Sequence, residues 1–117
     1  MKHNFRKLEI WKESRTLVKD TYMMTKKFPS SETYGLVSQI QRCSVSIVSN
    51  IAEGSARESD KHFLQYLETA LGSSFEGETQ LILAYDLRYI EEGFFNKQVS
   101  RIQKIQAMIS NFKNRLL

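Results

Sequence analysis

The spacing of the apolar residues constrains the fold of this chain more than any other feature of its sequence. These residues recur at intervals of three and four, the period of an α-helix, and no stretch keeps a period of two. One proline, Pro29, and five glycines interrupt the pattern within 117 residues. A chain of this length encloses one core, so we expect a single all-α domain over residues 1–117.

The first half of the sequence predicts two helices. The first covers about residues 8–28 and ends at Pro29, because proline cannot continue a helix. Ser30 or Ser31 is expected to cap the second helix. The apolar face of this helix continues up to Gly54, and glycine is the usual residue type just past a helix end.

The second half predicts two further helices. Ser59 has the side chain of a helix N-cap, and Asp60 suits the first turn of the third helix. This helix is expected to end between Tyr89 and Gly93, and Asn96 is the expected cap of the fourth helix. Four long helices joined by short connections predict an antiparallel up-and-down four-helix bundle.

Two glycines lie inside the predicted third helix. Gly72 and Gly77 each cost about 1 kcal/mol relative to alanine, so we expect a packing reason for both. If the second and third helices form a hairpin about Arg57, Gly77 falls opposite Val37. A large residue would then face a small one, and the two helix axes would approach closely.

The stretch "NIAEGSARES", residues 50–59, places Glu53 in the last turn of the second helix, where its charge opposes the helix dipole. Three interpretations are a catalytic carboxylate, a phosphate cradle around Arg57, and a structural anchor. The cradle is disfavoured because Glu53, Glu58 and Asp60 would repel an anion. We interpret Glu53 as an anchor that fixes the loop, either through a hydrogen bond or through an ion pair with a cation at the same end of the bundle. The candidate cations are Arg57, Lys7 and Arg115.

The sequence lacks the usual patterns of metal and nucleophile sites. A di-iron bundle needs Glu-x-x-His pairs, and neither His3 nor His62 follows a glutamate by three residues. Cys43, the single cysteine, falls in an apolar stretch and is expected to be buried. Glu78 is either a general base or, as we interpret it, a structural partner for a basic residue. We expect no metal, no cofactor and no enzymatic activity.

No long apolar run is present. The longest, residues 81–85, is far shorter than the roughly 20 residues that span a bilayer. We therefore expect a soluble cytoplasmic protein that does not bind a membrane.

Charge is distributed unevenly along the chain. Residues 1–28 hold eight Lys/Arg against three Asp/Glu, residues 29–93 hold four against ten, and residues 94–117 hold five against none. The first and fourth helices are neighbours in such a bundle, so one side is expected to be basic and the other acidic. The basic residues at helical spacing, predicted to face outward, are Lys12, Arg15, Lys19 and Lys26 in the first helix and Lys97, Arg101, Lys104 and Arg115 in the fourth.

These two basic stripes have three interpretations. They suit contacts with the phosphates of a nucleic acid, and they equally suit the acidic side of another copy of this protein. The third interpretation is a solvated face without a partner, because no compact arginine-rich segment or nucleic-acid motif is present.

The segments "FPSSETYGLVSQIQRCSVSIVSNIAEGSARES" and "FLQYLETALGSSFEGETQLILAYDLRYI", with Trp11 upstream, resemble a bacterial family. Its members are four-helix-bundle proteins often encoded within intervening sequences of 23S ribosomal RNA genes. Cys43 stands where this family more often has alanine. The distinctive matching residues are Phe28, Pro29, Glu32, Tyr34, Gly35, Leu36, Gln39, Ile40, Asn50, Ile51, Ala52, Glu53, Gly54, Arg57, Ala70, Gly72, Ser73, Glu76, Glu78 and Leu81.

The resemblance implies a four-helix bundle that assembles with itself into a symmetric ring, expected to be a homopentamer, without known enzymatic activity. A related branch contains accessory proteins of diversity-generating retroelements, which bind nucleic acid and a reverse transcriptase. Our first hypothesis is therefore a non-catalytic, ring-forming protein that binds RNA through the two basic stripes. The rival is a protein-interaction scaffold whose stripes pair with adjacent subunits or with a protein partner such as a reverse transcriptase.

Overall fold

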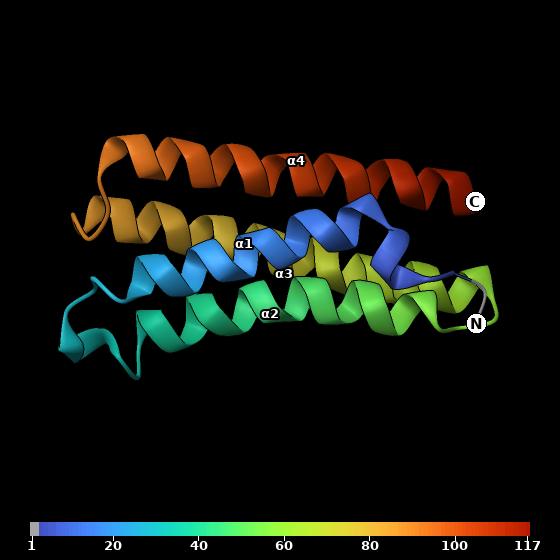
Figure 1. Cartoon of the computed structure of the whole chain (residues 1–117), viewed down its shortest axis with the longest axis horizontal. Helices are drawn as coiled ribbons and strands as arrows, with labels where there is room; N and C mark the ends of the chain where they lie inside the picture. Colours follow the sequence, from blue (N-terminus) through green and yellow to red (C-terminus); the bar gives the residue numbers. More distant parts are fainter. Residues whose placement is uncertain (1–2) are drawn as a thin grey trace.

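The computed structural model describes residues 3–117, so residues 1 and 2 of the predicted domain lie outside it. Four α-helices make up most of the described chain, which contains no strand (Figure 1). The all-α, four-helix prediction is confirmed. The elements in order are the short 3-10 helix η1 (Phe5–Lys7), α1 (Glu9–Thr25), the 3-10 helix η2 (Ser30–Glu32), α2 (Leu36–Ser55), α3 (Asp60–Asp86) and α4 (Glu92–Leu116).

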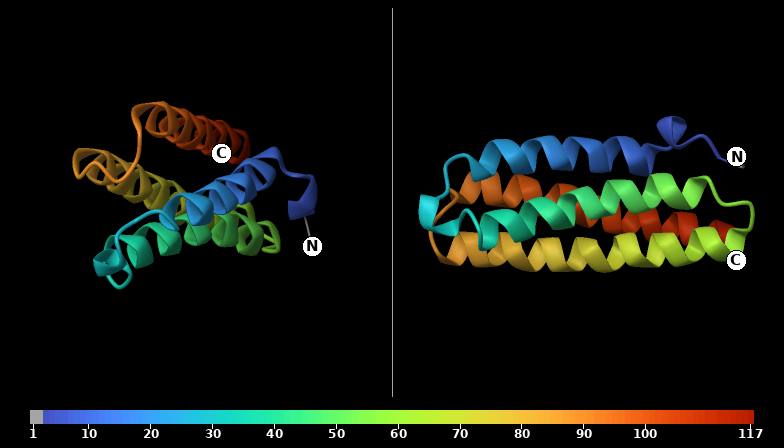
Figure 2. Two further views of the ribbon diagram at one scale, coloured as in Figure 1. Left: turned by 60° about the vertical axis from the view of Figure 1, so that its left-hand side comes forward. Right: turned by 90° about the horizontal axis from the view of Figure 1, so that it is seen from below.

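The helices form an elongated bundle with principal extents of 43 × 24 × 20 Å. Each helix packs on two others, because α1 and α3 both contact α2 and α4. The start of the described chain, at η1, and the C-terminus lie at the same end of the bundle, together with the α2–α3 connection (Figures 1 and 2). Along α2 and α3, Gln39 meets Gln80 and Ser46 meets Ser73, so these two helices run in opposite directions.

The core is built from the apolar stripes that the helical spacing predicts. Its fully buried side chains come from α2, α3 and α4, and α1 adds Leu17. Burial of each such aliphatic side chain contributes roughly 1.5–3 kcal/mol, which is why the periodic pattern determines the bundle. Members with at most 2% exposure include Leu17, Ile47, Ile51, Phe63, Leu67, Ile102, Ile105 and Ile109.

The predicted helix caps are partly correct. Ser59 caps α3 as expected, since its hydroxyl accepts a hydrogen bond from the backbone N–H of His62 at 3.1 Å. Ser30 and Ser31 were wrong as caps because they form η2. The N-cap residue of α2 is Gly35, and the carboxylate of Glu32 accepts a hydrogen bond from the N–H of Leu36 at 3.2 Å.

The boundaries of α3 and α4 also differ from the prediction. α3 ends at Asp86, before the predicted range, and Arg88 adopts a positive φ of 63° that reverses the chain early. α4 then begins at Glu92, so Asn96 lies inside the helix and is not its cap. Glu91 is the N-cap residue, without a side-chain hydrogen bond.

The α2–α3 hairpin has a different register from the predicted one. Gly77 packs against Cys43 instead of Val37, and a Cβ at Gly77 would lie 3.8 Å from the Cys43 Cβ. Gly54 lies inside α2, where a Cβ would come within 2.7 Å of the Cβ of Tyr66. Close helix approach therefore explains Gly54 and Gly77. Packing within the bundle does not explain Gly72, since no atom of another helix lies within 4 Å of its Cβ position.

Candidate nucleic-acid interface

Acidic residues of α1 bind basic residues of α4 across the helix interface. The carboxylate of Glu13 accepts hydrogen bonds from Arg101 Nη1 at 3.0 Å and from Lys104 Nζ at 2.9 Å. Asp20 Oδ2 lies 3.5 Å from Arg101 Nε and adds a second ion pair. Two of the three acids in the first 28 residues are therefore directed toward α4.

The basic residues of this cluster change the pKa of the Glu13 carboxyl. The hydrogen bond from Lys104 is the main cause that lowers the pKa of Glu13 below its usual value. Partial burial of Glu13 opposes this shift, and the charges of Lys104 and Arg101 add to it. Glu13 is consequently ionised near neutral pH and holds the two helices together.

The outward face of α1 is left with cations. Arg15, Lys19 and Lys26 are exposed, and no described carboxylate lies within 4 Å of their charged groups. Lys12 meets only the exposed carboxylate of Glu9, at 3.4 Å. We call Lys12, Arg15, Lys19 and Lys26 the α1 basic row; its spacing is the one that the sequence predicts.

The predicted stripe on α4 is less uniform. Arg101 was expected to face outward, but its side chain is only 23% exposed because it binds Glu13 and Asp20. Lys104 is 60% exposed and also binds Glu13. Lys97 is exposed, and the guanidinium of Arg115 lies over the Phe112 ring at 4.9 Å. Arg101 and Lys104 therefore bind α1, whereas Lys97 and Arg115 are exposed to solvent.

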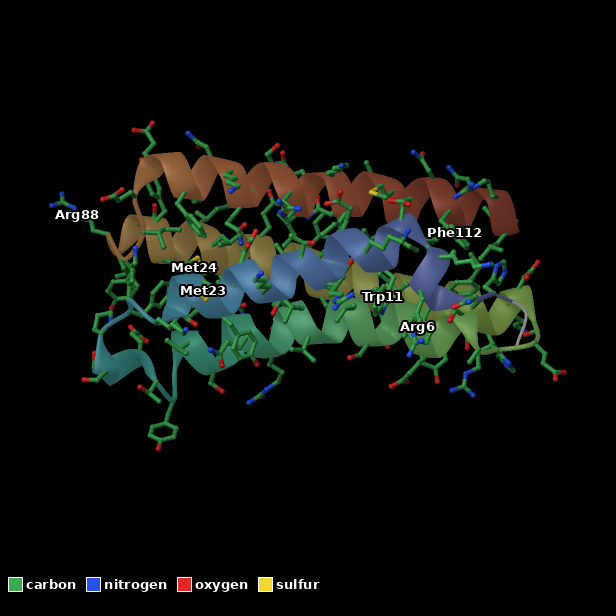
Figure 3. The ribbon with its side chains drawn as sticks, in the orientation of Figure 1. Arg6, Trp11, Met23, Met24, Arg88 and Phe112 are labelled. Atoms are coloured by element: carbon green, nitrogen blue, oxygen red, sulfur yellow. The ribbon has the colours of Figure 1, made fainter. Side chains whose placement is uncertain are left out.

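A group of aromatic and basic side chains lies beside the α1 basic row. The rings of Phe5 and Trp11 have centroids 5.0 Å apart, and the guanidinium groups of Arg6 and Arg15 lie over them. Figure 3 shows Arg6 and Trp11 near each other at the end of the bundle where η1 lies. Phe5 and Arg6 were not among the residues predicted from the sequence, although both precede a basic amphipathic helix that carries the single tryptophan.

The expected ion pair between Glu53 and a cation is not formed among residues 3–117. Glu53 and Arg57 are both exposed, and no described charged partner lies within 4 Å of either side chain. The guanidinium of Arg57 lies 5.1 Å from the centre of the Tyr66 ring instead. Arg57 thus fixes the α2–α3 connection through an aromatic contact.

Two further groups singled out in the sequence have structural partners. Glu78 accepts hydrogen bonds from Gln103 at 3.1 Å and Gln106 at 2.8 Å, so its α4 partners are amides, not the predicted basic residue. Burial raises the pKa of the Cys43 thiol to about 11, and Glu76 adds to this shift. Cys43 is therefore protonated near neutral pH and lacks the nucleophilic thiolate.

Residues 3–117 contain no group of three or more His, Cys, Asp or Glu side chains placed to hold a metal ion. None of the helices described is both long and apolar enough to cross a membrane.

Comparison with curated proteins gives no match. The family model described as 23S rRNA-intervening sequence protein matches residues 6–111, which include all four helices almost entirely. The chain therefore belongs to the 23S rRNA-intervening sequence protein family.

Proposed function

We propose that this protein is a non-catalytic, cytoplasmic RNA-binding protein whose α1 basic row contacts phosphates. One observation carries the proposal: Glu13 and Asp20 are bound to α4. Among the described residues, the α1 basic row therefore keeps a single acidic contact, the exposed carboxylate of Glu9 beside Lys12. Phosphate contacts of this kind give weak sequence specificity and a steep dependence on salt. We assign the exposed α4 cations Lys97, Lys104 and Arg115 to the same contact, whereas Arg101 holds the helices together.

We further propose that the protein assembles with itself, as a ring. A specific observation favours self-assembly: the outer side of α3 exposes Phe75, Ile82, Leu83 and Leu87, each at 42% or more. Monomeric proteins seldom leave several large apolar side chains along one helix face in water. A homopentamer remains our expectation for the number of subunits. A protein partner such as a reverse transcriptase is a further candidate for this face.

Filter-binding titrations with a structured RNA at low and high salt test the RNA proposal. The double variant Arg15→Glu with Lys19→Glu should weaken binding by at least about tenfold and reduce the salt dependence, because two phosphate contacts are lost. The matched control is Arg42→Glu with Lys61→Glu, which changes the net charge equally on α2 and α3.

The comparison of these two variants decides the outcome. RNA binding that is lost with the α1 variant and kept with the control supports the α1 basic row as the contact. Equal losses in both variants would mean that only net charge matters. No salt-dependent binding by the unmodified protein would contradict the proposal outright.

A further inference from the structure

An open hollow of about 690 Å³ lies beside the start of α1. Its lining residues are Phe5, Arg6, Trp11, Lys12 and Arg15. Two of these are aromatic, three are cationic, and no carboxylate lines the hollow. The hollow at the opposite end of the bundle differs, because Glu91 lines it together with Met23 and Arg88 (Figure 3).

The two rings form a V and are only partly buried. The planes of Phe5 and Trp11 are inclined by 59°, with their centroids 5.0 Å apart, and both side chains have intermediate exposure. The guanidinium of Arg15 lies 5.5 Å from the Trp11 ring centre, and that of Arg6 lies 5.9 Å from the Phe5 ring centre. A flat, electron-rich group can stack on such rings or on the guanidinium planes.

Hydrogen bonds of the backbone and of Asn4 hold this arrangement in place. Asn4 Oδ1 accepts from the N–H of Arg6 at 3.1 Å, and the N–H of Leu8 donates to the carbonyl of Phe5 at 3.0 Å. The N–H of His3 donates to the carbonyl of Ser55 at 3.4 Å, which ties this segment to the end of α2. The His3 ring also packs on Phe63 with centroids 5.1 Å apart.

A nucleotide with an unpaired base matches the chemistry of this hollow. Its base offers a flat face to the aromatic rings, and its phosphate offers a negative charge to Arg6, Lys12 and Arg15. A base within a duplex is already stacked and paired, so its face is not available to a side chain. The remaining cations of the α1 basic row continue from the hollow along the helix, which gives the backbone a path to follow.

We infer that this hollow is a stacking site for an unpaired base of RNA, and that it makes the protein prefer single-stranded over duplex RNA. The inference rests on the proposed RNA-binding function and adds the class of RNA and the place of base contact. Phe5 and Trp11 stack on the base, while the α1 basic row holds the adjoining phosphates.

Trp11 is the only tryptophan, so its fluorescence reports directly on the hollow. Titration with oligouridylate, which cannot pair with itself, should quench or shift the emission of Trp11. An RNA duplex of the same length at the same salt should change the emission much less. Fluorescence anisotropy of labelled RNA provides the two dissociation constants, and the single strand should bind about tenfold tighter or more.

Two variants separate stacking from charge. Phe5→Leu keeps the Trp11 reporter and all cations, and should weaken binding of the single strand about tenfold while leaving the duplex unchanged. Trp11→Leu should do the same, with circular dichroism confirming that the bundle is folded. Tyr34→Leu is the matched control, because Tyr34 is 97% exposed in the α1–α2 connection, far from the hollow.

The outcomes distinguish this inference from the broader proposal. If both RNA forms bind equally, lose affinity in the Arg15→Glu and Lys19→Glu variant, and leave Trp11 emission unchanged, the phosphate contacts stand and the stacking site is overturned. If Trp11 emission changes with protein concentration alone, a second copy occupies the hollow and the inference is wrong. If neither RNA form binds, the proposed function itself fails.

Discussion

Glu13 shows how one carboxylate determines which cations of this protein remain free. Replacement by glutamine removes the charge that binds Arg101 and Lys104, and should lower the free energy of unfolding by about 1–2 kcal/mol at neutral pH. The pKa of Glu13 is lowered by folding, so its contribution is present above its ordinary value of 4.5 and is lost as the pH falls through the folded value.

Chemical unfolding near neutral pH and at pH values below 4.5 measures this effect. The unmodified protein should lose more stability on acidification than Glu13→Gln, because the variant has no carboxylate at this position to protonate. Glu9→Gln is the control: the ion pair of Glu9 with Lys12 is exposed and should matter by less than about 0.5 kcal/mol. Equal losses in the two variants would contradict a specific role for Glu13.

Gln98 is the least satisfied buried polar side chain of α4. It is fully buried, and neither its Nε2 nor its Oε1 has a hydrogen-bond partner among the described residues. Gln98→Leu should therefore raise the free energy of unfolding by about 1–2 kcal/mol, since an apolar side chain of similar size does not lose hydrogen bonds to water on burial. Urea unfolding measures the change; a lower stability would mean that the amide is satisfied in solution.

At the scale of the helices, two glycines differ in what an added Cβ would meet. In Gly54→Ala, the new Cβ would lie 2.7 Å from the Tyr66 Cβ and 2.8 Å from the Phe63 ring, so we expect a loss of about 2 kcal/mol or more. Gly72→Ala meets no atom within 4 Å and should stabilise α3 by up to about 1 kcal/mol. Thermal unfolding of the two variants measures whether each is less or more stable than the unmodified protein. A lower stability of Gly72→Ala would indicate that a partner packs against this position.

The position of a helix end can depend on contacts between residues that are distant in the sequence. A local sequence pattern does not contain such contacts. Ser59 was identified correctly because an N-cap acts within its own turn. The start of α2 was missed, since Glu32 reaches Leu36 from another element and its second carboxylate oxygen accepts from the Tyr89 hydroxyl at 2.9 Å. That hydrogen bond to Tyr89 joins positions 57 residues apart, beyond any local signal.

For the whole molecule, the exposed apolar side of α3 predicts self-assembly. Phe75, with 53% of its surface exposed, is the first residue of this side in the sequence and its only aromatic member. Phe75→Glu should shift the protein from an oligomer to a smaller species, because a buried, unpaired carboxylate would be placed in the interface. Light scattering after size-exclusion chromatography measures the molar mass.

Tyr34→Glu is the control for that experiment, as Tyr34 is more exposed but lies away from α3 in the α1–α2 connection. A molar mass that is unchanged by Phe75→Glu would exclude this side of α3 as the interface. A monomeric unmodified protein would contradict self-assembly altogether.

The sequence by itself determined that this chain is four helices around one core, because apolar periodicity is a local property repeated over every turn. It also placed Lys12, Arg15, Lys19 and Lys26 in one row, since a single helix sets their spacing. Only the tertiary structure decided which charges are free, because Glu13 and Arg101 are 88 residues apart and meet only through the packing of α1 on α4. The same packing set the α2–α3 register and brought Phe5 against Trp11, contacts that depend on how helices and turns fit together in space.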